Sequence, residues 1–195
     1  MKIIDISQEI LSCKVYPGDP VPGYERLVSM DKGDVYNMSA FSMCAHNGTH
    51  VDAPFHFIND GNTIENIPLE SFVGICYVAH YDGEVNAAAA GEIMGKAVKT
   101  GAPDRILIKG NAVVMPDGAK VFADHKIKLI GNESQSVGDE NAPMAVHKIL
   151  LSQNIVLLEG VVLDEAKEGK YFLSAVPLNI KGFDGSPCRA YLIEL

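Results

Sequence analysis

Short apolar runs separated by turn-forming residues dominate the chain, and this pattern is typical of β-strands. The runs are rich in Ile, Val, Leu, Tyr and Phe, and Gly, Asn, Asp or Pro stand between most of them. The pattern predicts strands at residues 2–7, 35–43, 74–81, 105–110, 127–132, 155–160, 171–180 and 188–195.

Two segments have helical features instead. Residues 86–101, NAAAAGEIMGKAVKTG, combine an Ala-rich composition with apolar positions near helical spacing. Residues 139–154, DENAPMAVHKILLSQN, offer Asp139 or Asn141 as the N-cap and Pro143 in the first turn, followed by an apolar stripe. The sequence therefore predicts few helices among many strands.

The organisation of the chain indicates one domain. No linker rich in Pro, Gly or Ser and no internal repeat divides the 195 residues, so we expect a single α/β domain over residues 1–195 with a mixed sheet. With 47% hydrophobic and 21% charged residues, the composition is that of a globular protein. A net charge of −9 argues against a nucleic-acid or anionic-membrane partner.

The N-terminal residues bear on the cellular location of the protein, and the cysteines bear on its metal and redox chemistry. The first ten residues, MKIIDISQEI, do not resemble a signal peptide, and no apolar run is long enough for a membrane helix. These features predict a cytoplasmic protein. The four cysteines are far apart and form no CxxC pair, so neither a thiolate zinc site nor a redox pair is expected.

Half of the six histidines fall within residues 46–57, HNGTHVDAPFHF. The glycine, the β-branched residues and the proline of this segment argue against a helix. In an extended segment His46, His50, Asp52 and His56 share parity, so their side chains would point to one side.

A bend at Gly48 would turn this row into a metal site. His50 and Asp52 would lie about 6.6 Å apart along a strand, whereas His46 would be about 13 Å from His50 if the chain stayed straight. Glycine permits the bend that brings His46 back. Two imidazoles and a carboxylate suit Zn²⁺ or Mn²⁺ and leave a coordination position open for catalysis. Histidines satisfied by structural hydrogen bonds are the alternative, which the clustering disfavours.

Two later residues are less clear from spacing alone. His147 lies in the second predicted helix, and Glu159 ends the predicted strand at 155–160. A helix that runs back along a strand could bring both side chains to the opening of the same site. A helical histidine and a solvated strand end are the simpler interpretation at this point.

The whole sequence resembles one family. Residues 46–57 resemble the HxGTHxDxPxH signature of the cyclase-like metal hydrolases, which include bacterial kynurenine formamidase (arylformamidase) and isatin hydrolase. The segments DIS at 5–7, YPGDP at 16–20, HKILL at 147–151 and residues 157–190 resemble the opening and the second half of the family.

The resemblance implies a two-ion centre, Zn or Mn, in an α/β fold of the swivelling β/β/α type. His46, His50 and Asp52 match the ligands of a first ion, and Asp52 would bridge to a second ion completed by His147 and Glu159. His56 matches the catalytic acid/base. The resemblance also implies a homodimer or larger homo-oligomer.

Two features depart from the family pattern and bear on the substrate. A Gly-x-Asp-Thr-x-Ser-like stretch is replaced by residues 131–136, GNESQS, and the chain has no tryptophan for an aromatic wall. Neither feature touches the metal ligands.

The expected activity is hydrolysis of a non-peptide C–N amide bond, linear or cyclic, with water activated by metal and a proton delivered by His56. N-formylkynurenine is the first substrate to test.

Two alternatives stay open. Cys44, two residues from His46, could act as a nucleophile, although this leaves the other histidines without a role. The other alternative is a protein of the same fold that binds a metal or a ligand without catalysing a reaction. Such a protein would not need His56. His80 and His125 lie outside the motifs, and we assign them no function.

Overall fold

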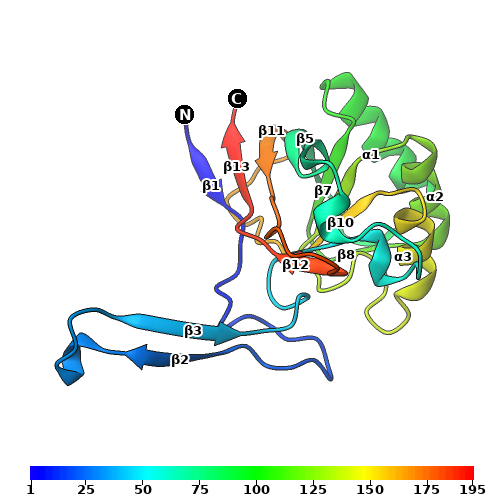
Figure 1. Cartoon of the computed structure of the whole chain (residues 1–195). Helices are drawn as coiled ribbons and strands as arrows, with labels where there is room; N and C mark the ends of the chain where they lie inside the picture. Colours follow the sequence, from blue (N-terminus) through cyan, green and yellow to red (C-terminus); the bar gives the residue numbers. More distant parts are fainter.

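Nine strands form one mixed β-sheet, and three α-helices cover one of its faces (Figure 1). The computed structural model describes all residues from 1 to 195. The α/β class and the mixed sheet are therefore confirmed. Across the sheet the strand order is β1 (Ile3–Asp5), β13 (Tyr191–Glu194), β11 (Gly169–Ser174), β5 (Val73–His80), β7 (Arg105–Lys109), β9 (Leu129–Asn132), β10 (Val156–Glu159), β4 (His50–Asp52) and β12 (Gly185–Pro187).

The centre of the sheet is parallel, and its connections carry the helices. β5, β7, β9 and β10 run parallel to one another, while the pairings on either side of them are antiparallel. Parallel neighbours need crossover connections, usually helical. These are supplied by α1 (Ala87–Lys99), α2 (Pro116–Asp124) and α3 (Met144–Leu151). No helix in the structure combines the length and apolar character that a membrane span requires.

Apolar side chains are buried on both faces of the central strands. In β7, Ile106 and Ile108 belong to the core beneath the helices, whereas Leu107 belongs to the core on the opposite face. This double burial explains why the strand reads as a continuous apolar run rather than an alternating one. The sheet thus lies between two hydrophobic cores.

The ends of the predicted helices differ in how they are capped. Asn86, the first residue of the predicted helical segment, caps α1, because its side chain accepts hydrogen bonds from the backbone N–H groups of Ala88 and Ala89. The predicted cap of the second helix is wrong. α3 begins at Met144 after Pro143, with no side-chain cap, and Asp139 accepts from the N–H of Asn141 in a local turn instead. Residues 139–143 of the predicted segment thus precede the helix, and the helix is shorter than its pattern.

All eight predicted strands exist, and most of the strands that were missed are short. They include β6 (Gly83–Val85), β8 (Ala112–Val114) and β12, each of three residues. Three residues are too few for an alternating pattern to stand out. Helix α2 was also missed. Gly118 lies inside it because a Cβ there would meet the Val85 carbonyl oxygen at 2.1 Å, so packing dictates a residue of poor helix propensity.

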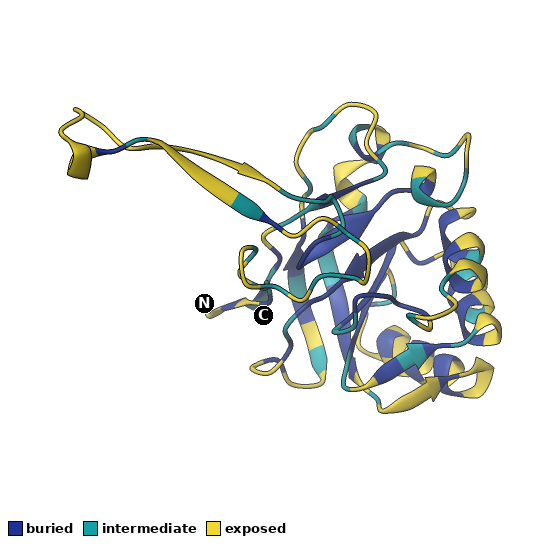
Figure 2. Cartoon of the chain, turned by 90° about the horizontal axis from the view of Figure 1, so that it is seen from below, coloured by how far each residue is buried: buried dark blue, intermediate teal, exposed yellow.

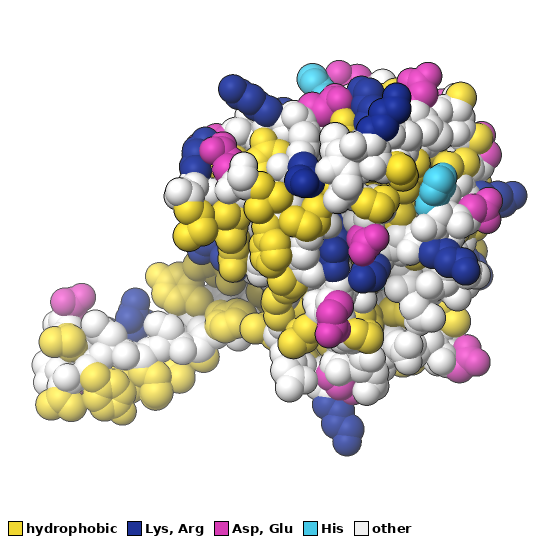
Figure 3. Space-filling view, turned by 90° about the horizontal axis from the view of Figure 1, so that it is seen from above, with side chains coloured by type: hydrophobic (Ala, Val, Ile, Leu, Met, Phe, Trp, Pro, Cys, Tyr) yellow, Lys and Arg dark blue, Asp and Glu magenta, His cyan; other side chains and the backbone are white.

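A β-hairpin projects from the body of the protein (Figures 1 and 2). It consists of β2 (Gly23–Val28), which the sequence pattern did not indicate, and β3 (Met38–Ser42), and we call residues 23–42 the arm. Every residue of β3 is exposed, and so are the middle four of β2. Large apolar side chains point to solvent along the arm (Figure 3): Tyr24, Leu27, Met30, Val35, Tyr36, Met38 and Phe41.

Candidate metal centre

Two neighbouring strands and one helix bring four polar side chains to the same face of the sheet. β4 and β10 pair antiparallel with Glu159 opposite His50 and Leu157 opposite Asp52. Because side chains alternate along a strand, His50, Asp52 and Glu159 all face the side that α3 covers. His147 of α3 meets them there, and all four residues are at most 3% exposed. Spacing alone did not predict this meeting of helix and strand end.

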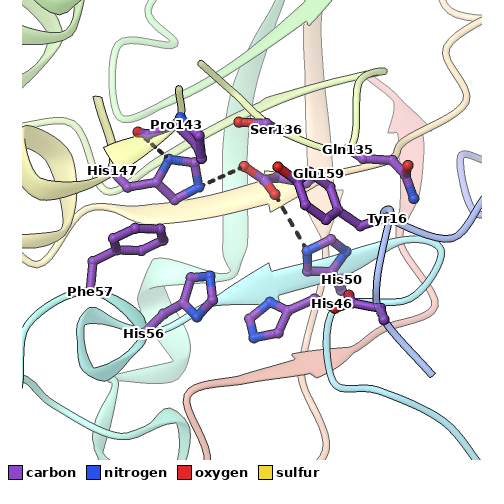
Figure 4. A pocket seen from close by; sticks show the side chains of 11 residues that line it. Tyr16, His46, His50, His56, Phe57, Gln135, Ser136, Pro143, His147 and Glu159 are labelled. Carbon is purple, nitrogen blue, oxygen red and sulfur yellow. Dashed lines mark hydrogen bonds and ion pairs between the residues drawn. The ribbon is translucent and has the colours of Figure 1, made fainter. Parts of the chain in front are cut away.

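The four side chains form a ring in which imidazoles and carboxylates alternate. Figure 4 shows the part of it in which Glu159 lies between His50 and His147. His50 Nε2 lies 3.5 Å from Asp52 Oδ1 and 3.4 Å from Glu159 Oε2. His147 Nε2 lies 3.5 Å from Asp52 Oδ2 and 3.3 Å from Glu159 Oε1. Ligand atoms bound tetrahedrally at about 2.1 Å from an ion lie about 3.4 Å from one another. The spacing of the ring therefore fits a divalent metal better than it fits direct hydrogen bonds.

Backbone carbonyls set the orientation of both imidazoles in the ring. Nδ1 of His50 lies 3.0 Å from the Gly48 carbonyl oxygen, and Nδ1 of His147 lies 3.0 Å from that of Pro143. A proton on Nδ1 leaves the Nε2 lone pair directed at the carboxylates, which is the arrangement found around metal-bound histidines. Asp52 Oδ2 is buried and has no hydrogen-bond partner in the chain. The donor atoms of the ring thus point to one centre, which a metal ion could occupy in place of protons.

His46 lies beside this ring because the chain bends at Gly48, as the sequence predicts. Gly48 has a φ of 64°, in the left-handed region that favours glycine. His46 Nδ1 comes within 2.8 Å of Asp52 Oδ1, and its Nε2 within 2.8 Å of Asp184 Oδ2. Gly185 makes room for the ring, since a Cβ there would lie 2.7 Å from His46 Cε1.

His56 reaches the site by a different backbone path from the one predicted. It lies in a 3₁₀ turn (Pro54–His56) rather than in an extended strand, so the shared parity with Asp52 is wrong for this residue. Pro54 occupies the first turn, where its fixed φ suits a helical start. The His56 ring nonetheless stacks on His46 with centroids 4.0 Å apart, and its Nδ1 lies 3.3 Å from Asp184 Oδ2.

Asp184 is the residue that sequence reasoning missed. It precedes β12, which pairs with β4 in a register that sets Gly185 opposite Asp52. No spacing signal links it to the histidine cluster, because the contact depends on a strand of three residues near the end of the sequence. Thr49 of the signature has a structural role: its Oγ1 donates to the Gly160 carbonyl and accepts from the Gln8 N–H.

The structure groups the possible metal ligands differently from the predicted assignment to a first and a second ion. Two sets have ligand atoms within 4.8 Å of one another: His46 with Asp52 and His56, and His50 with Asp52 and Glu159. The ring distances add His147 to the second set. Asp52 belongs to both sets, so it occupies the position expected of a bridging carboxylate. The assignment of individual residues to a first and a second ion stays a prediction.

The electrostatics of the site favour a cation. Burial opposes protonation of His46, but Asp52 and Asp184 outweigh it and raise the pKa of His46 to about 11. Burial likewise opposes protonation of His147, while Asp52 and Glu159 raise its pKa to about 10. The imidazoles in turn hold the pKa of the buried Asp52 carboxyl well below its usual range, against its desolvation. The carboxylates therefore stabilise positive charge on the neighbouring imidazoles. A divalent metal can supply this charge instead of protons.

A cavity of about 310 Å³ opens above the ring and is bounded partly by residues outside the histidine motif. His46, His50, His56, His147 and Glu159 form its floor. Phe57 lies at the edge of this floor. The centroid of its ring is 4.6 Å from that of His56 and 4.7 Å from that of His147. Tyr16, Asp19, Gln135 and Ser136 also line the cavity, and Figure 4 shows Tyr16 and Gln135 on the side away from Phe57.

The alternative nucleophile does not lie on this cavity. Cys44 is half-buried, its backbone N–H donates to Asn47 Oδ1, and its side chain is not part of the cavity wall. His80 and His125, for which no function is predicted, also lie away from it.

The comparisons with known proteins agree with this geometry. A family model described as a putative cyclase matches residues 4–139. The chain is 35% identical to the kynurenine formamidase of Erythrobacter litoralis over 211 residues, covering 100% of this chain and 94% of that protein. The chain belongs to the cyclase family. This confirms the resemblance on which the sequence interpretation was based.

Solved structures of relatives have the same fold. A predicted metal-dependent hydrolase from Bacillus stearothermophilus is 26% identical, with a TM-score of 0.81 over 98% of this chain and 97% of that one. Isatin hydrolase A from Labrenzia aggregata is 22% identical, with a TM-score of 0.82 over 98% of this chain and 93% of that one, a likeness of fold. The family architecture thus extends over nearly the full chain.

Proposed function

We propose that this cyclase-family protein is a metal-dependent hydrolase of non-peptide C–N amide bonds, with a linear formamide or a cyclic amide as substrate. The observation that carries the proposal is the buried ring of His50, Asp52, His147 and Glu159, with ligand spacing of 3.3–3.5 Å, at the floor of a cavity. The kynurenine formamidase relative supports the reaction class.

We propose two divalent ions, Zn or Mn, held by His46, His50, Asp52, His147 and Glu159. Such ions polarise a substrate carbonyl and acidify water near neutral pH. The ring residues hold their lone pairs in position before any ligand arrives, since backbone carbonyls fix both imidazoles. Burial excludes bulk water from the ring and strengthens every charge interaction within it.

His56 is proposed as the acid that protonates the leaving nitrogen. An amine departs from a tetrahedral centre only when it receives a proton, so a residue on the cavity wall must deliver one. The contact of His56 Nδ1 with Asp184 Oδ2 leaves Nε2 for the proton transfer. The stacking on His46 holds the ring beside the metal ligands.

The test is metal analysis combined with a substrate panel. Elemental analysis of untreated protein should find stoichiometric Zn or Mn. The metal-loaded protein should hydrolyse formanilide or N-formylkynurenine, with cyclic imides and lactams as the other members of the panel. Stoichiometric metal without turnover of any member would favour the alternative, a metal-binding protein of the same fold that does no chemistry.

We also propose that the protein is a homodimer or larger homo-oligomer. The arm supports this, because an isolated two-stranded hairpin is marginally stable in water and this one exposes large apolar side chains on the outside. Sedimentation analysis should give a mass of at least two chains, and Tyr36→Glu with Phe41→Glu should lower it to that of one chain. The cytoplasmic location stays a prediction of the sequence.

A further inference from the structure

Ser136 brings a buried hydroxyl to the cavity next to a proposed metal ligand. The residue is 2% exposed and lines the cavity. The peptide nitrogen that follows it, that of Val137, donates to Glu159 Oε1 at 2.8 Å. Figure 4 shows Ser136 on the side of Glu159 away from His56. The hydroxyl therefore lies at the end of the cavity where the proposed reaction takes place.

The Ser136 hydroxyl has no hydrogen-bond partner in the chain. The neighbouring Glu159 carboxylate already accepts from Val137 and lies against both imidazoles of the ring. A buried polar group without a partner is destabilising, and such groups mark places where a ligand completes the hydrogen bond. The O–H of Ser136 is thus free to donate to a bound molecule.

The backbone on both sides of Ser136 is fixed, so the position of its side chain is set before a ligand arrives. The Ser136 carbonyl accepts from Asn132 Nδ2 at 3.1 Å, and the buried Asn132 also donates to the Ala112 carbonyl. The Val137 carbonyl accepts from the Val114 N–H at 3.0 Å. A donor held in this way needs little reorganisation when charge develops opposite it.

Most other donors around the cavity already face partners in the protein. The Tyr16 hydroxyl donates to a backbone carbonyl, and so does Gln135 Nε2. The ring nitrogens of three imidazoles face carboxylates or backbone carbonyls: those of His46, His50 and His147. Nε2 of His56 is uncommitted, and it is proposed to serve the leaving nitrogen. Ser136 is therefore the hydroxyl of the lining that is available for another group of the substrate.

The carbonyl oxygen of an amide is a group that needs such a donor. It is an acceptor, and it gains negative charge when water adds to the carbonyl carbon. A donor that meets this oxygen stabilises the tetrahedral transition state more than it stabilises the planar substrate, so it raises kcat.

We infer that the Ser136 hydroxyl donates a hydrogen bond to the carbonyl oxygen of the scissile amide and stabilises the charge that develops there. This inference rests on the proposed amide hydrolysis and adds a catalytic residue to it. Ser136 forms no covalent bond and keeps its proton throughout. The oxygen becomes a carbonyl oxygen again when the C–N bond breaks and the nitrogen takes a proton from His56.

Ser136→Ala tests this role on formanilide. The kcat of the metal-loaded variant should fall about 10- to 100-fold with little change in KM, because the lost interaction belongs to the transition state. Ser174→Ala is the matched control and should keep its kcat, since Ser174 is a buried serine of β11 that does not line this cavity. An unchanged kcat in Ser136→Ala, or a rise in KM alone, would overturn the inference.

The stability and metal content of Ser136→Ala separate catalysis from a structural role. The hydroxyl has no partner in the protein, so the Tm should not fall and elemental analysis should find the metal content of the unmodified protein. A lower Tm together with a loss of metal would show that the hydroxyl supports the metal centre instead, against the inference.

The pH dependence of kcat separates the carbonyl oxygen from the attacking water as the partner of Ser136. A donor to the carbonyl oxygen leaves the ionisation of the water unaltered, so the midpoint of the profile should stay within about 0.3 pH units of that of the unmodified protein. A displacement of about one pH unit would assign the hydroxyl to the water and refute its role at the carbonyl oxygen.

Calorimetry with N-phenylphosphoramidate distinguishes this inference from the proposed function. Its tetrahedral anion takes the place of the formyl group of formanilide, and metal-loaded Ser136→Ala should bind it about 10-fold more weakly than the unmodified protein does. Turnover of formanilide that Ser136→Ala leaves unaffected refutes the inference and leaves amide hydrolysis standing. If no formamide is hydrolysed, the proposed function fails, and the analogue still decides the inference: weaker binding by the variant supports it, and equal binding or no binding by both proteins refutes it.

Discussion

Asp184 Oδ2 lies 2.8 Å from Nε2 of His46, across a sequence separation of 138 residues. The same oxygen lies 3.3 Å from Nδ1 of His56. Hydrogen bonds from both imidazoles hold the pKa of the Asp184 carboxyl below its usual range, so it is an anion at neutral pH. One carboxylate therefore orients both a proposed metal ligand and the proposed acid.

Asp184→Asn keeps the size of the side chain and removes its charge. We expect kcat on a formamide substrate to fall about 10- to 100-fold, because the orientation of His56 is loosened. Ion content should fall by less than one per chain. An unchanged kcat in steady-state assays would show that the contact of Asp184 with His56 has no role in the reaction.

His50→Ala removes one corner of the ring and should abolish stoichiometric metal, measured by elemental analysis. The remaining carboxylates would face each other with one imidazole fewer between them. His80→Ala is the matched control, because His80 lies on β5 with a largely exposed side chain. Full metal occupancy in His50→Ala would refute the metal site.

Glu159→Gln preserves the shape of the side chain and its acceptor for the Val137 N–H. The loss of charge should lower metal occupancy by about one ion per chain while the other ion stays bound. Metal titration followed by elemental analysis measures this. If the metal count and the activity both stay at the level of the unmodified protein, Glu159 is not a ligand.

His56→Ala should keep its metal and its fold but lose about 10²- to 10⁴-fold in turnover of a formamide. The loss should shrink for substrates with less basic leaving amines, because a weaker base departs with less help from an acid. A series of ring-substituted formanilides measures this dependence. Loss of metal would make His56 a ligand, and near-normal rates with basic leaving groups would assign the proton to another residue.

Alkaline pH should destabilise the metal-free protein. The pKa values of His46 and His147 are raised to about 11 and about 10, so their stabilisation is complete below the ordinary histidine value near 6.5 and is lost as pH rises toward the folded-state values. The Tm in EDTA should fall by at least about 3 °C between pH 7 and pH 9. His147→Asn should show a smaller fall, and so should the metal-loaded protein. A Tm that rises with pH in EDTA would contradict the charge state of the cluster.

The sequence predicts the strands of the central sheet and the histidine cluster for the same physical reason: both are local patterns. The apolar run of β7 reflects burial on two faces, and the bend at Gly48 follows from the freedom of glycine. His147 and Glu159 needed the family resemblance, since only the pairing of β10 with β4 and the packing of α3 bring them to Asp52.

The residues that sequence patterns do not predict are those whose positions depend on long-range pairing. Asp184 is placed by β12, and the Gln135 amide is aimed into the cavity by a hydrogen bond to Lys14, which is 121 residues away. The 3₁₀ turn at His56 follows a different rule. Its proline permits either an extended chain or a helical start, and the tertiary structure decides between them.

The placement of β12 beside β4 sets the order of events during biosynthesis. His46 and His50 leave the ribosome more than a hundred residues before Asp184, a delay on the order of ten seconds at usual rates of translation. Until residues 184–187 have emerged, β4 lacks one of its two neighbours in the sheet and His46 lacks its second carboxylate. The strand that carries His50 and Asp52 is therefore flanked on both sides only after residues 185–187 have been synthesised.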